Sequence, residues 1–339
     1  MPSPPPLPFT AQLALTRLSP TTYQCTQPPQ PMGNALRIAY GGFALAVALK
    51  AACYSVPSGY HLYSFMGNYL GPASVDRCLY ARVRDVRQTR SFATRHVEVY
   101  QVLDSDSEAS KANQAPKERI CLFATSDFHI QEPAGTLLSY HCPPRREGGY
   151  THHTLCPAKS RTAADLLAAG KISQSTHDAF TAAFALNSSL FDIKMCPEGI
   201  FAQNLSGHAK SLPHSQDHLP LPSRTSADWF RATGELPSQT EQLAALAFYA
   251  DGALSFCPLS FSHMYLEDSG ACSSLDFSLR VFGDVDLERW HLREVGTHVG
   301  AQGRTYSEAW IWDEEGRAVA CMSQQSILRV LPGKGKGKL

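Results

Sequence analysis

Three segments of this sequence carry the side chains that could do acid–base chemistry. The first is an apolar run, residues 243–256, which holds a single carboxylate at Asp251. A carboxylate buried without a partner is costly, so a residue in this setting is usually paired, protonated or functional. The second is a strand-like run over residues 272–279, and the third is a C-terminal strand that carries Gln324. Together, more than any one alone, these segments indicate what the protein does.

The composition excludes several classes of protein. The chain has 339 residues, which is long enough for two domains, and 43% of them are hydrophobic, as in ordinary globular proteins. With 30 basic and 30 acidic residues the net charge is zero, which argues against nucleic acid or an anionic membrane as the partner. No run reaches the ~18 apolar residues of a membrane span. The N-terminus also lacks the basic start and apolar core of a signal peptide.

The cysteines and histidines do not indicate a metal site. The chain has 10 cysteines, none of which forms a C-x-x-C pair, so zinc-ribbon and thioredoxin-like sites are not expected. Because no signal peptide is visible, we expect reduced thiols that mostly pack as small core residues. The adjacent His152 and His153 cannot easily bind one ion without further ligands. We therefore expect neither a metal nor a cofactor.

Apolar patterns predict one arrangement twice, a buried helix followed by strands. Both helices are apolar nearly all round, and the strands alternate with period two. In the first half the helix is predicted over residues 39–53, after a short strand over 13–25 and before strands over 60–69, 77–88, 91–103 and 119–129. In the second half the helix is predicted over 241–256, with strands over 272–282, 289–298, 305–313 and 318–330.

The two halves also align with each other. Residues 63–71 match residues 275–283, and residues 90–92 match residues 304–306. A unit of about 100 residues therefore occurs twice, which is the signature of a duplicated fold. A long apolar helix wrapped by an antiparallel sheet is the hotdog arrangement. The sequence therefore predicts a double hotdog, an α+β fold whose two sheets join edge to edge.

The same patterns divide the chain into five parts. We expect an N-terminal hotdog over residues 11–141 and a C-terminal hotdog over residues 236–331. Residues 142–235 are rich in Pro, Ser and His, hold one helix predicted around 163–185, and predict an inter-domain connection. The Pro-rich residues 1–10 are predicted to be disordered, and the basic residues 332–339 to form a flexible tail.

Several motifs resemble the type II acyl-CoA thioesterases, which are double-hotdog (C/M/P thioester hydrolase-like) enzymes of bacteria, peroxisomes and fungi. Within this family the chain resembles a fungal-type member. Residues 40–43, Tyr-Gly-Gly-Phe, are similar to the first-helix motif that begins F-G-G. Residues 62–72, with Leu-Tyr-Ser-Phe and Gly-Pro, resemble H-S-F…R-P. Residues 84–95 resemble the strand R-D-G-R-S-F-x-x-R, and residues 229–231 resemble the W-x-R start of the second half. The similarity extends roughly from residue 10 to residue 331.

The resemblance implies a site in which an Asp, a Thr or Ser, and a Gln surround one water molecule. These residues fall on Asp251, Ser274 and Gln324, with Ser273 and Gln325 as the neighbouring alternatives. Asp251 would accept a proton from the water, which Ser274 and Gln324 would orient. Backbone N–H groups at the start of a hotdog helix would hold the oxyanion. The sequence has no G-x-S-x-G motif, which disfavours the serine-hydrolase route.

The sequence departs from the family pattern at three places. Phe43 replaces a Gln, Phe277 replaces a His, and Gly71 stands where an Arg precedes Pro. More aromatic surface near the site would suit a bulky or branched acyl group. Two other functions stay open. One is a hotdog hydratase or dehydratase, although its N-x-x-H or D-x-N-P-x-H segment is not found. The other is a module that binds acyl-CoA without cleaving it.

The expected function is hydrolysis of an acyl-CoA to a free carboxylic acid and CoA, in fatty-acyl lipid metabolism or in specialised (secondary) metabolism. The expected partner is the acyl-CoA substrate, with no nucleic acid and no membrane, and tandem hotdogs also allow a homo-oligomer. The last three residues, Gly337 to Leu339, resemble the peroxisomal Ser-Lys-Leu address. Localisation is therefore predicted to be the peroxisome or the cytoplasm.

Overall fold

The computed structural model describes residues 7–33, 37–103, 117–131 and 137–331. The predicted tail, residues 332–339, lies outside these ranges, as do residues 1–6 and most of the loop predicted between the strands at 103 and 119. Residues 7–10 are described, and Phe9 begins a short helix with its ring buried, so this part of the N-terminus is ordered. None of the described helices is long and apolar enough to cross a membrane.

The first half follows the predicted order closely. The segment predicted as one strand over 13–25 is a two-stranded hairpin, preceded by a helical turn at Phe9–Gln12. The buried helix and the four strands after it lie within a few residues of their predicted bounds. The elements are α1 (Phe9–Gln12), β1 (Leu15–Ser19), β2 (Thr22–Cys25), α2 (Gly41–Tyr54), β3 (Tyr60–Tyr69), β4 (Tyr80–Gln88), β5 (Phe92–Val102) and β6 (Glu118–Ile130).

The second half repeats this order with one break. The strand predicted over 272–282 is two strands with a break at Leu275, because both pair with the last strand of the chain but only the second also pairs with β3. The elements are α7 (Gln239–Ala250), α8 (Cys257–Ser260), η4 (Leu266–Asp268), β9 (Ser269–Ser274), β10 (Asp276–Val281), β11 (His291–Ala301), β12 (Arg304–Asp313) and β13 (Ala318–Val330).

The middle of the chain contains more structure than its composition predicts. The single helix predicted around 163–185 is two helices separated by Gly170, and two strands follow. The elements are α3 (Lys159–Ala168), α4 (Gln174–Ala183), α5 (Ala185–Leu190), β7 (Phe191–Met195), α6 (Ile200–Asn204), η2 (Leu205–Gly207), η3 (Leu221–Ser223) and β8 (Thr225–Ala232). The boundaries at 141 and 236 stay a prediction. We propose that the second unit also includes β7 and β8, because β8 pairs with β11.

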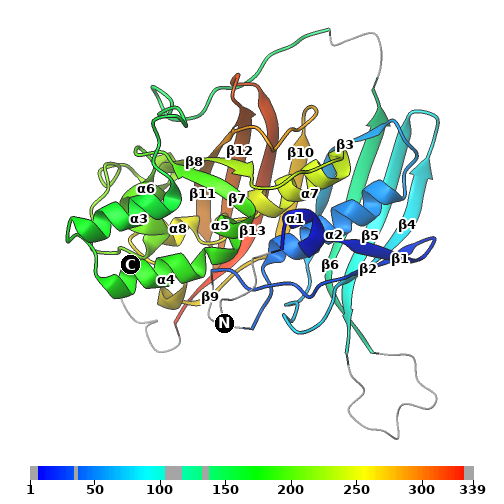
Figure 1. Ribbon diagram of the computed structural model, residues 1–339, viewed down its shortest axis with the longest axis horizontal. Helices are drawn as coiled ribbons and strands as arrows, with labels where there is room; N and C mark the ends of the chain where they lie inside the picture. Colours follow the sequence, from blue (N-terminus) through cyan, green and yellow to red (C-terminus); the bar gives the residue numbers. More distant parts are fainter. Residues whose placement is uncertain (1–6, 34–36, 104–116, 132–136, 332–339) are drawn as a thin grey trace, which may run out of the picture.

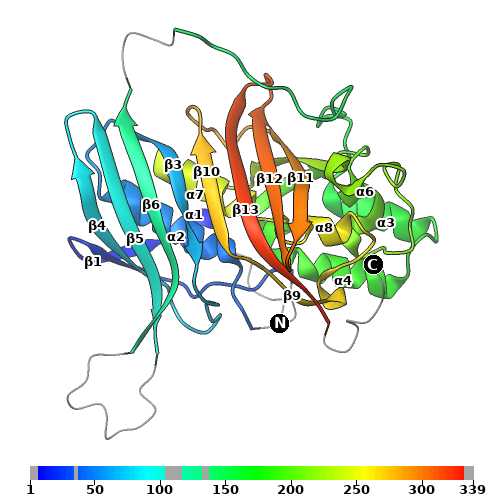
Figure 2. The ribbon, with the colours of Figure 1, turned by 180° about the vertical axis from the view of Figure 1, so that it is seen from behind.

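The strands form one antiparallel sheet that crosses the whole molecule, with the long helices on one face (Figures 1 and 2). The strand order is β1-β2-β4-β5-β6-β3-β10-β13-β12-β11-β8-β7, and β9 pairs with β13 outside this path. The two halves meet where β3 pairs with β10. The predicted edge-to-edge double hotdog is therefore confirmed.

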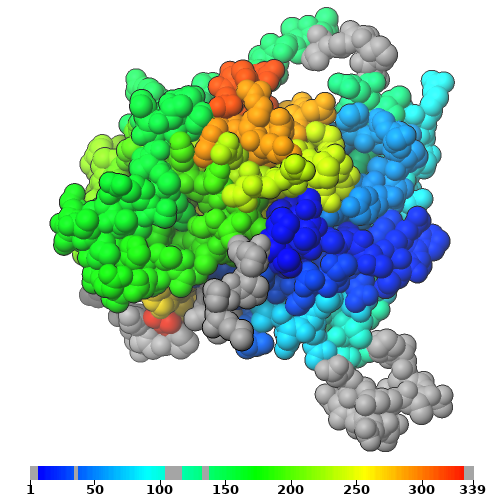
Figure 3. All heavy atoms as spheres, viewed as in Figure 1, coloured from blue at the N-terminus to red at the C-terminus, as the bar shows by residue number. Residues whose placement is uncertain are grey.

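Helices α2 and α7 lie side by side and run in opposite directions. Every residue of α2 from Gly42 to Ala52 is buried, as its Ala- and Leu-rich sequence predicts. The one cation in this helix, Lys50, forms a buried ion pair with Glu241 of α7 at 2.7 Å, and also donates to the Leu13 carbonyl. In Figure 3 the middle segment covers one half of the helix face and the N-terminal elements cover the other.

Candidate active site

Asp251 caps the C-terminal end of α7, so the prediction of a helix that continues to residue 256 is wrong. The helix ends at Ala250 because Gly252 follows and Ala253 adopts a left-handed backbone with φ of 83°. The Arg293 guanidinium donates to the carbonyls of Tyr249 and Gly252, at 3.0 and 2.8 Å. The Asp251 side chain is thereby held at a fixed, buried helix end, with 7% of the residue exposed.

The structure joins the three residues implied by the sequence through hydrogen bonds. The Gln324 amide nitrogen donates to Asp251 Oδ1 at 2.5 Å. At the other end of the same amide, the Ser274 hydroxyl donates to Gln324 Oε1 at 3.1 Å. Since both ends of the amide are engaged, its orientation is fixed. The result is a continuous chain from Ser274 through Gln324 to Asp251.

The sheet explains why these residues and not their neighbours reach Asp251. Successive side chains on a strand point to opposite faces. Gln324 is fully buried on the helix side of β13, whereas Gln325 is exposed on the other side. Ser274 is half-buried and Ser273 is exposed. The nearby carboxylate of Asp276 accepts the backbone N–H of Gln325 at 2.8 Å.

The break at Leu275 places Ser274 next to the amide. β10 pairs with both β3 and β13, but β9 pairs only with β13, opposite Ser274 at Ser326. The Leu275 carbonyl accepts the backbone N–H of Tyr69, the last residue of β3, at 2.9 Å. The strands β3 and β9 therefore separate at this point. We call this divergence of the two strands the opening, and it lies in front of the end of α7.

Two tyrosines, which sequence reasoning did not assign to the site, surround the carboxylate. Tyr69 donates its hydroxyl to Asp251 Oδ1 at 2.7 Å. Tyr40, immediately before α2, donates to the Phe248 carbonyl at 2.6 Å. Burial raises the pKa of both phenols well above the usual value, so both stay protonated as donors. The signal for Tyr69 was present, because it lies in the block that repeats as residues 275–283.

The pKa of Asp251 is raised from its ordinary value, and the main cause is burial. Hydrogen bonds from Tyr69, Gln324 and Tyr40, and from the backbone of Gly42, each oppose this rise. All of these donors are neutral. A second buried carboxylate close by, Asp228, instead pairs with Arg293 at 2.7 Å. Asp251 is thus the carboxylate left without a cation, which favours proton uptake.

The N-terminus of α2 approaches Asp251 more closely than any residue with a side chain would allow. A Cβ on Gly41 would lie 3.1 Å from Asp251 Oδ2 and 3.1 Å from the Tyr69 ring. A Cβ on Gly42 would lie 2.9 Å from the Phe248 carbonyl oxygen. The first backbone N–H groups of a helix have no partner within it and carry partial positive charge. This end of α2 can therefore stabilise negative charge that develops beside Asp251.

The two aromatic replacements do not enlarge the exposed surface. Phe43 is 1% exposed and packs edge-on against Phe248, with ring centroids 5.2 Å apart. Phe277 is 3% exposed and lies between Phe65 and Tyr69, at 4.8 and 5.8 Å. The expectation of more aromatic surface near the site is therefore wrong. Both rings instead fill space in the core behind the site.

Two groups of described side chains bring possible metal ligands together, both away from Asp251. In one, His152 and His153 meet Glu314, whose carboxylate lies 2.6 Å from His153 Nε2. In the other, Asp217 Oδ1 lies 3.0 Å from His214 Nε2 and 2.6 Å from His263 Nε2. The Glu314 carboxylate is a hydrogen-bond partner of His153, and the Asp217 carboxylate is a hydrogen-bond partner of His263.

Comparison with known proteins points to one family over most of the chain. Residues 28–113 match the family model described as acyl-CoA thioesterase N-terminal domain, and residues 195–328 match the acyl-CoA thioesterase C-terminal domain. Acyl-CoA thioesterase 2 of Haemophilus influenzae is 22% identical over 301 residues, which cover 86% of this chain and 88% of that protein.

Solved structures agree in fold. The acyl-CoA thioesterase II TesB2 of Mycobacterium marinum is 18% identical and matches with a TM-score of 0.65, over 96% of this chain and 99% of that one. The tesB protein of Mycobacterium avium subsp. paratuberculosis is 16% identical, with a TM-score of 0.64 over 94% and 98%. A protein with a hot dog fold from Alicyclobacillus acidocaldarius is 15% identical, with a TM-score of 0.63 over 95% and 98%.

Proposed function

Because this chain belongs to the type II acyl-CoA thioesterase family, its activity is the hydrolysis of acyl-CoA thioesters, and we propose that Asp251 is the general base of that reaction. The observation that carries the proposal is the buried hydrogen bond from Gln324 to Asp251, continued by Ser274 on the far side of the amide. A buried carboxylate with a raised pKa and only neutral donors is suited to take a proton near neutral pH.

In the proposed reaction, Asp251 accepts a proton from water as the water oxygen attacks the thioester carbonyl. Tyr69 and Gln324 both donate to Oδ1, so Oδ2, on the side of Gly41, is the oxygen that takes the proton. Ser274 and Gln324 fix the position of the water, which lowers the entropic cost of the attack.

The remaining steps return the proton and release both products. The carbonyl oxygen becomes an oxyanion, which the partial positive charge at the start of α2 stabilises. The carbonyl then re-forms, the C–S bond breaks, and the thiolate of CoA takes the proton held by Asp251. The products are the carboxylic acid and CoA, and the carboxylate is ready for another turnover. No covalent intermediate on the protein is needed.

A panel of acyl-CoAs with straight, branched and aromatic acyl groups, followed with a thiol reagent, tests this function. We expect release of free CoA from at least one of them, and the preferred member defines the acyl class. If the protein binds acyl-CoA tightly but releases no thiol from any of them, the non-catalytic binding module is correct. Loss of absorbance by an enoyl-CoA without thiol release would indicate a hydratase.

We further propose that the protein acts in lipid metabolism, in either fatty-acyl turnover or the release of a specialised product. The two routes differ in the acyl group, so the same panel separates them. Preference for straight chains supports fatty-acyl turnover. Preference for branched or aromatic acyl groups supports a specialised route.

We propose a peroxisomal location on the basis of residues 337–339, Gly-Lys-Leu, with the basic residues before them assisting recognition. A fluorescent fusion that keeps the C-terminus free tests this. It should colocalise with a Ser-Lys-Leu control, and removal of the last three residues should disperse it. Diffuse signal from the intact fusion, with the control in peroxisomes, supports the cytoplasm.

We also propose that the protein forms a homo-oligomer, because sheets of this kind have edges that can meet a second copy. In this chain β1 and β7 form the two ends of the sheet. Light scattering coupled to gel filtration gives the mass directly. A mass equal to that of one chain at micromolar concentration contradicts the proposal.

A further inference from the structure

The two halves of the sheet are related by an approximate twofold axis between β3 and β10. The aligned blocks 63–71 and 275–283 make Ser64 equivalent to Asp276 and Asn68 equivalent to Arg280. In the sheet Ser64 pairs with Arg280, and Asn68 pairs with Asp276. The equivalence therefore exchanges these two pairs, as a twofold axis requires. Each feature at one end of the helix pair has a counterpart at the other end.

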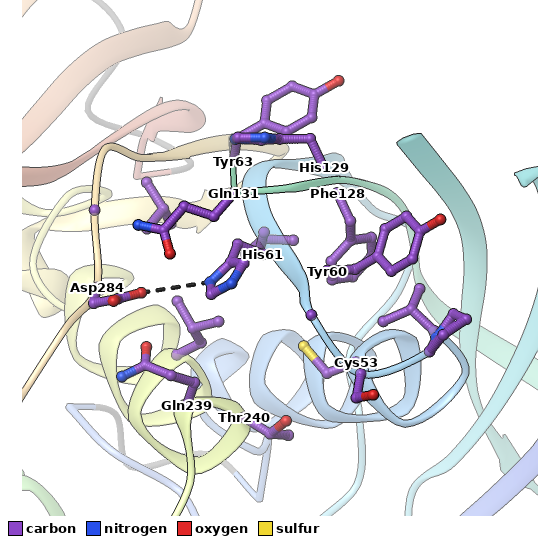
Figure 4. Close-up of a pocket in the computed structure, with 18 of the residues that line it drawn as sticks. Cys53, Tyr60, His61, Tyr63, Phe128, His129, Gln131, Gln239, Thr240 and Asp284 are labelled. Carbon is purple, nitrogen blue, oxygen red and sulfur yellow. Dashed lines mark ion pairs between the residues drawn. The ribbon is translucent and has the colours of Figure 1, made fainter. Parts of the chain in front are cut away.

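The opening in front of Asp251 has such a counterpart. Beyond the Ser64–Arg280 pair, the start of β3 and the chain after β10 separate, as β3 and β9 do at the other end. Here the C-terminus of α2 and the N-terminus of α7 lie behind the opening. Between them is a hollow with a volume of about 1000 Å³. It is lined by β3, β6, both helix ends and the residues that follow β10 (Figure 4).

The hollow has an apolar floor and a polar rim. The floor is made by the half-buried Cys53 and by buried side chains from α7 and the sheet: Leu62, Phe128, Leu243 and Val281. In Figure 4, His61 points across the opening towards Asp284, at 3.5 Å, and Gln131 and Gln239 lie near them. A hollow of this size suits a ligand with a long apolar part and a hydrogen-bonding part.

The hydrolytic side chains are missing from this end. The residue that caps α2, in the place of Asp251, is Ser55. Phe65 and Phe277 are equivalent, and their partners on the neighbouring strands β6 and β13 are Ser126 and Gln324, so Gln324 corresponds to Ser126. Extending the same alignment by one residue makes Leu62 the counterpart of Ser274. The buried Arg95 donates to Ser55 at this end. A cation therefore lies where the other end has its buried carboxylate, so the position equivalent to Asp251 supplies no base.

We propose that this hollow is a second acyl-CoA site, which binds the acyl chain on its apolar floor and does not hydrolyse the thioester. The site goes beyond the proposed hydrolysis at Asp251. The twofold relation gives it the same helix-end and strand framework as the catalytic opening. The apolar floor fits the acyl chain, and the amide and imidazole groups of the rim fit the amide-rich pantetheine arm of CoA. Its phosphates then extend into solvent.

Gly283 provides a variant that fills the hollow. It lines the hollow, it follows β10, and a Cβ at this position would meet no atom within 4 Å. Gly283→Trp therefore adds bulk without strain. Gly300→Trp, on β11 away from both openings, is the matched control, because a Cβ there makes only an ordinary contact with Thr305 at 3.8 Å.

The test counts bound equivalents of a non-hydrolysable 2-oxoalkyl-CoA by native mass spectrometry and calorimetry. The wild-type protein and Gly300→Trp should bind two equivalents, and Gly283→Trp should bind one, with unchanged thermal unfolding. The proposal is overturned if Gly283→Trp binds as many equivalents as the wild type with the same Kd. It is also overturned if the hollow takes only free alkanoate and no 2-oxoalkyl-CoA. Hydrolysis is measured separately by thiol release, so failure of this site leaves the assignment of Asp251 untouched.

Discussion

The two ends of the α2–α7 pair share one backbone framework and differ in a few side chains. At one end, Asp251 follows α7 and receives Gln324 and Tyr69. At the other end, Ser55 follows α2 and receives Arg95. The strands, the helix ends and the opening in the sheet are equivalent. The comparison teaches that the fold supplies the opening and the helix dipole, while the side chains decide whether water is activated there.

The two ends differ most sharply in the buried charged side chain that each one holds. At the Asp251 end every donor to the carboxylate is neutral, and burial raises its pKa. At the other end the buried Arg95 is held by Asp85, at 2.9 Å, and by the chain around it. A general base must be deprotonated near neutral pH in order to accept a proton, and an arginine stays protonated there. The end that we propose to be hydrolytic is therefore the one where a buried carboxylate has no cation.

Removing the base should have the largest effect. Asp251→Asn keeps the shape and the hydrogen bonds but cannot accept a proton, so kcat should fall by roughly 10²–10⁴-fold. Ser55→Ala, the matched change at the other end, should alter kcat less than about twofold, since it touches no group in the proposed reaction. Steady-state thiol release measures both. If Asp251→Asn keeps near-wild-type turnover, Asp276 becomes the next candidate.

Removing a residue that orients the water should have a smaller effect on kcat. Gln324→Ala and Ser274→Ala each remove one contact in the same chain, so each should lower kcat by up to roughly 10²-fold, the cost of a small misplacement. The double variant should lose little more than the worse single one, because both residues act on one water. Gln325→Ala, on the exposed face, is the control. Fully additive losses would contradict a shared role.

The pH dependence of the reaction should follow the raised pKa of Asp251. The base works only when deprotonated, so kcat/KM should fall as the pH drops through a value above that of an ordinary Asp. Tyr69→Phe removes the hydrogen bond that most strongly opposes this rise in pKa, so the acid limb should move to higher pH. A limb that stays in place, or moves to lower pH, would show that Tyr69 does not hold this carboxylate.

The raised pKa of Asp251 should also make the stability of the protein depend on pH, with a smaller effect. Because the folded protein raises the pKa of Asp251, folding favours the protonated form, and this contribution is present at low pH and lost as the pH rises through the folded value. Asn at position 251 cannot ionise, so Asp251→Asn does not lose this stability as the pH rises. The variant should therefore gain a few degrees in Tm over the wild type at pH 8 and less at pH 5. Equal differences at both pH values would indicate that the carboxylate is not destabilising when charged.

Much of the fold could be read from periodicity. The apolar run of α2 and the alternation of β3 to β6 are local patterns, so their bounds were predicted closely. The end of α7 was not, because Phe256 lies in an apolar run that continues past the break at Gly252 and Ala253. Strands β7 and β8 were missed because a Pro- and Ser-rich composition predicts loops, whereas pairing with β11 decided their structure.

The sequence by itself determined the duplicated unit and the antiparallel strands, and it indicated the three candidate residues Asp251, Ser274 and Gln324, since local pattern and family resemblance carry that information. Only the tertiary structure decided which residues share a site. Tyr69 and Gly41 reach Asp251 across 182 and about 210 positions of chain. The antiparallel packing of α2 and α7 places the start of one helix beside the end of the other. The fold also sets the pKa of Asp251, because its burial and its neutral hydrogen-bond donors depend on that packing.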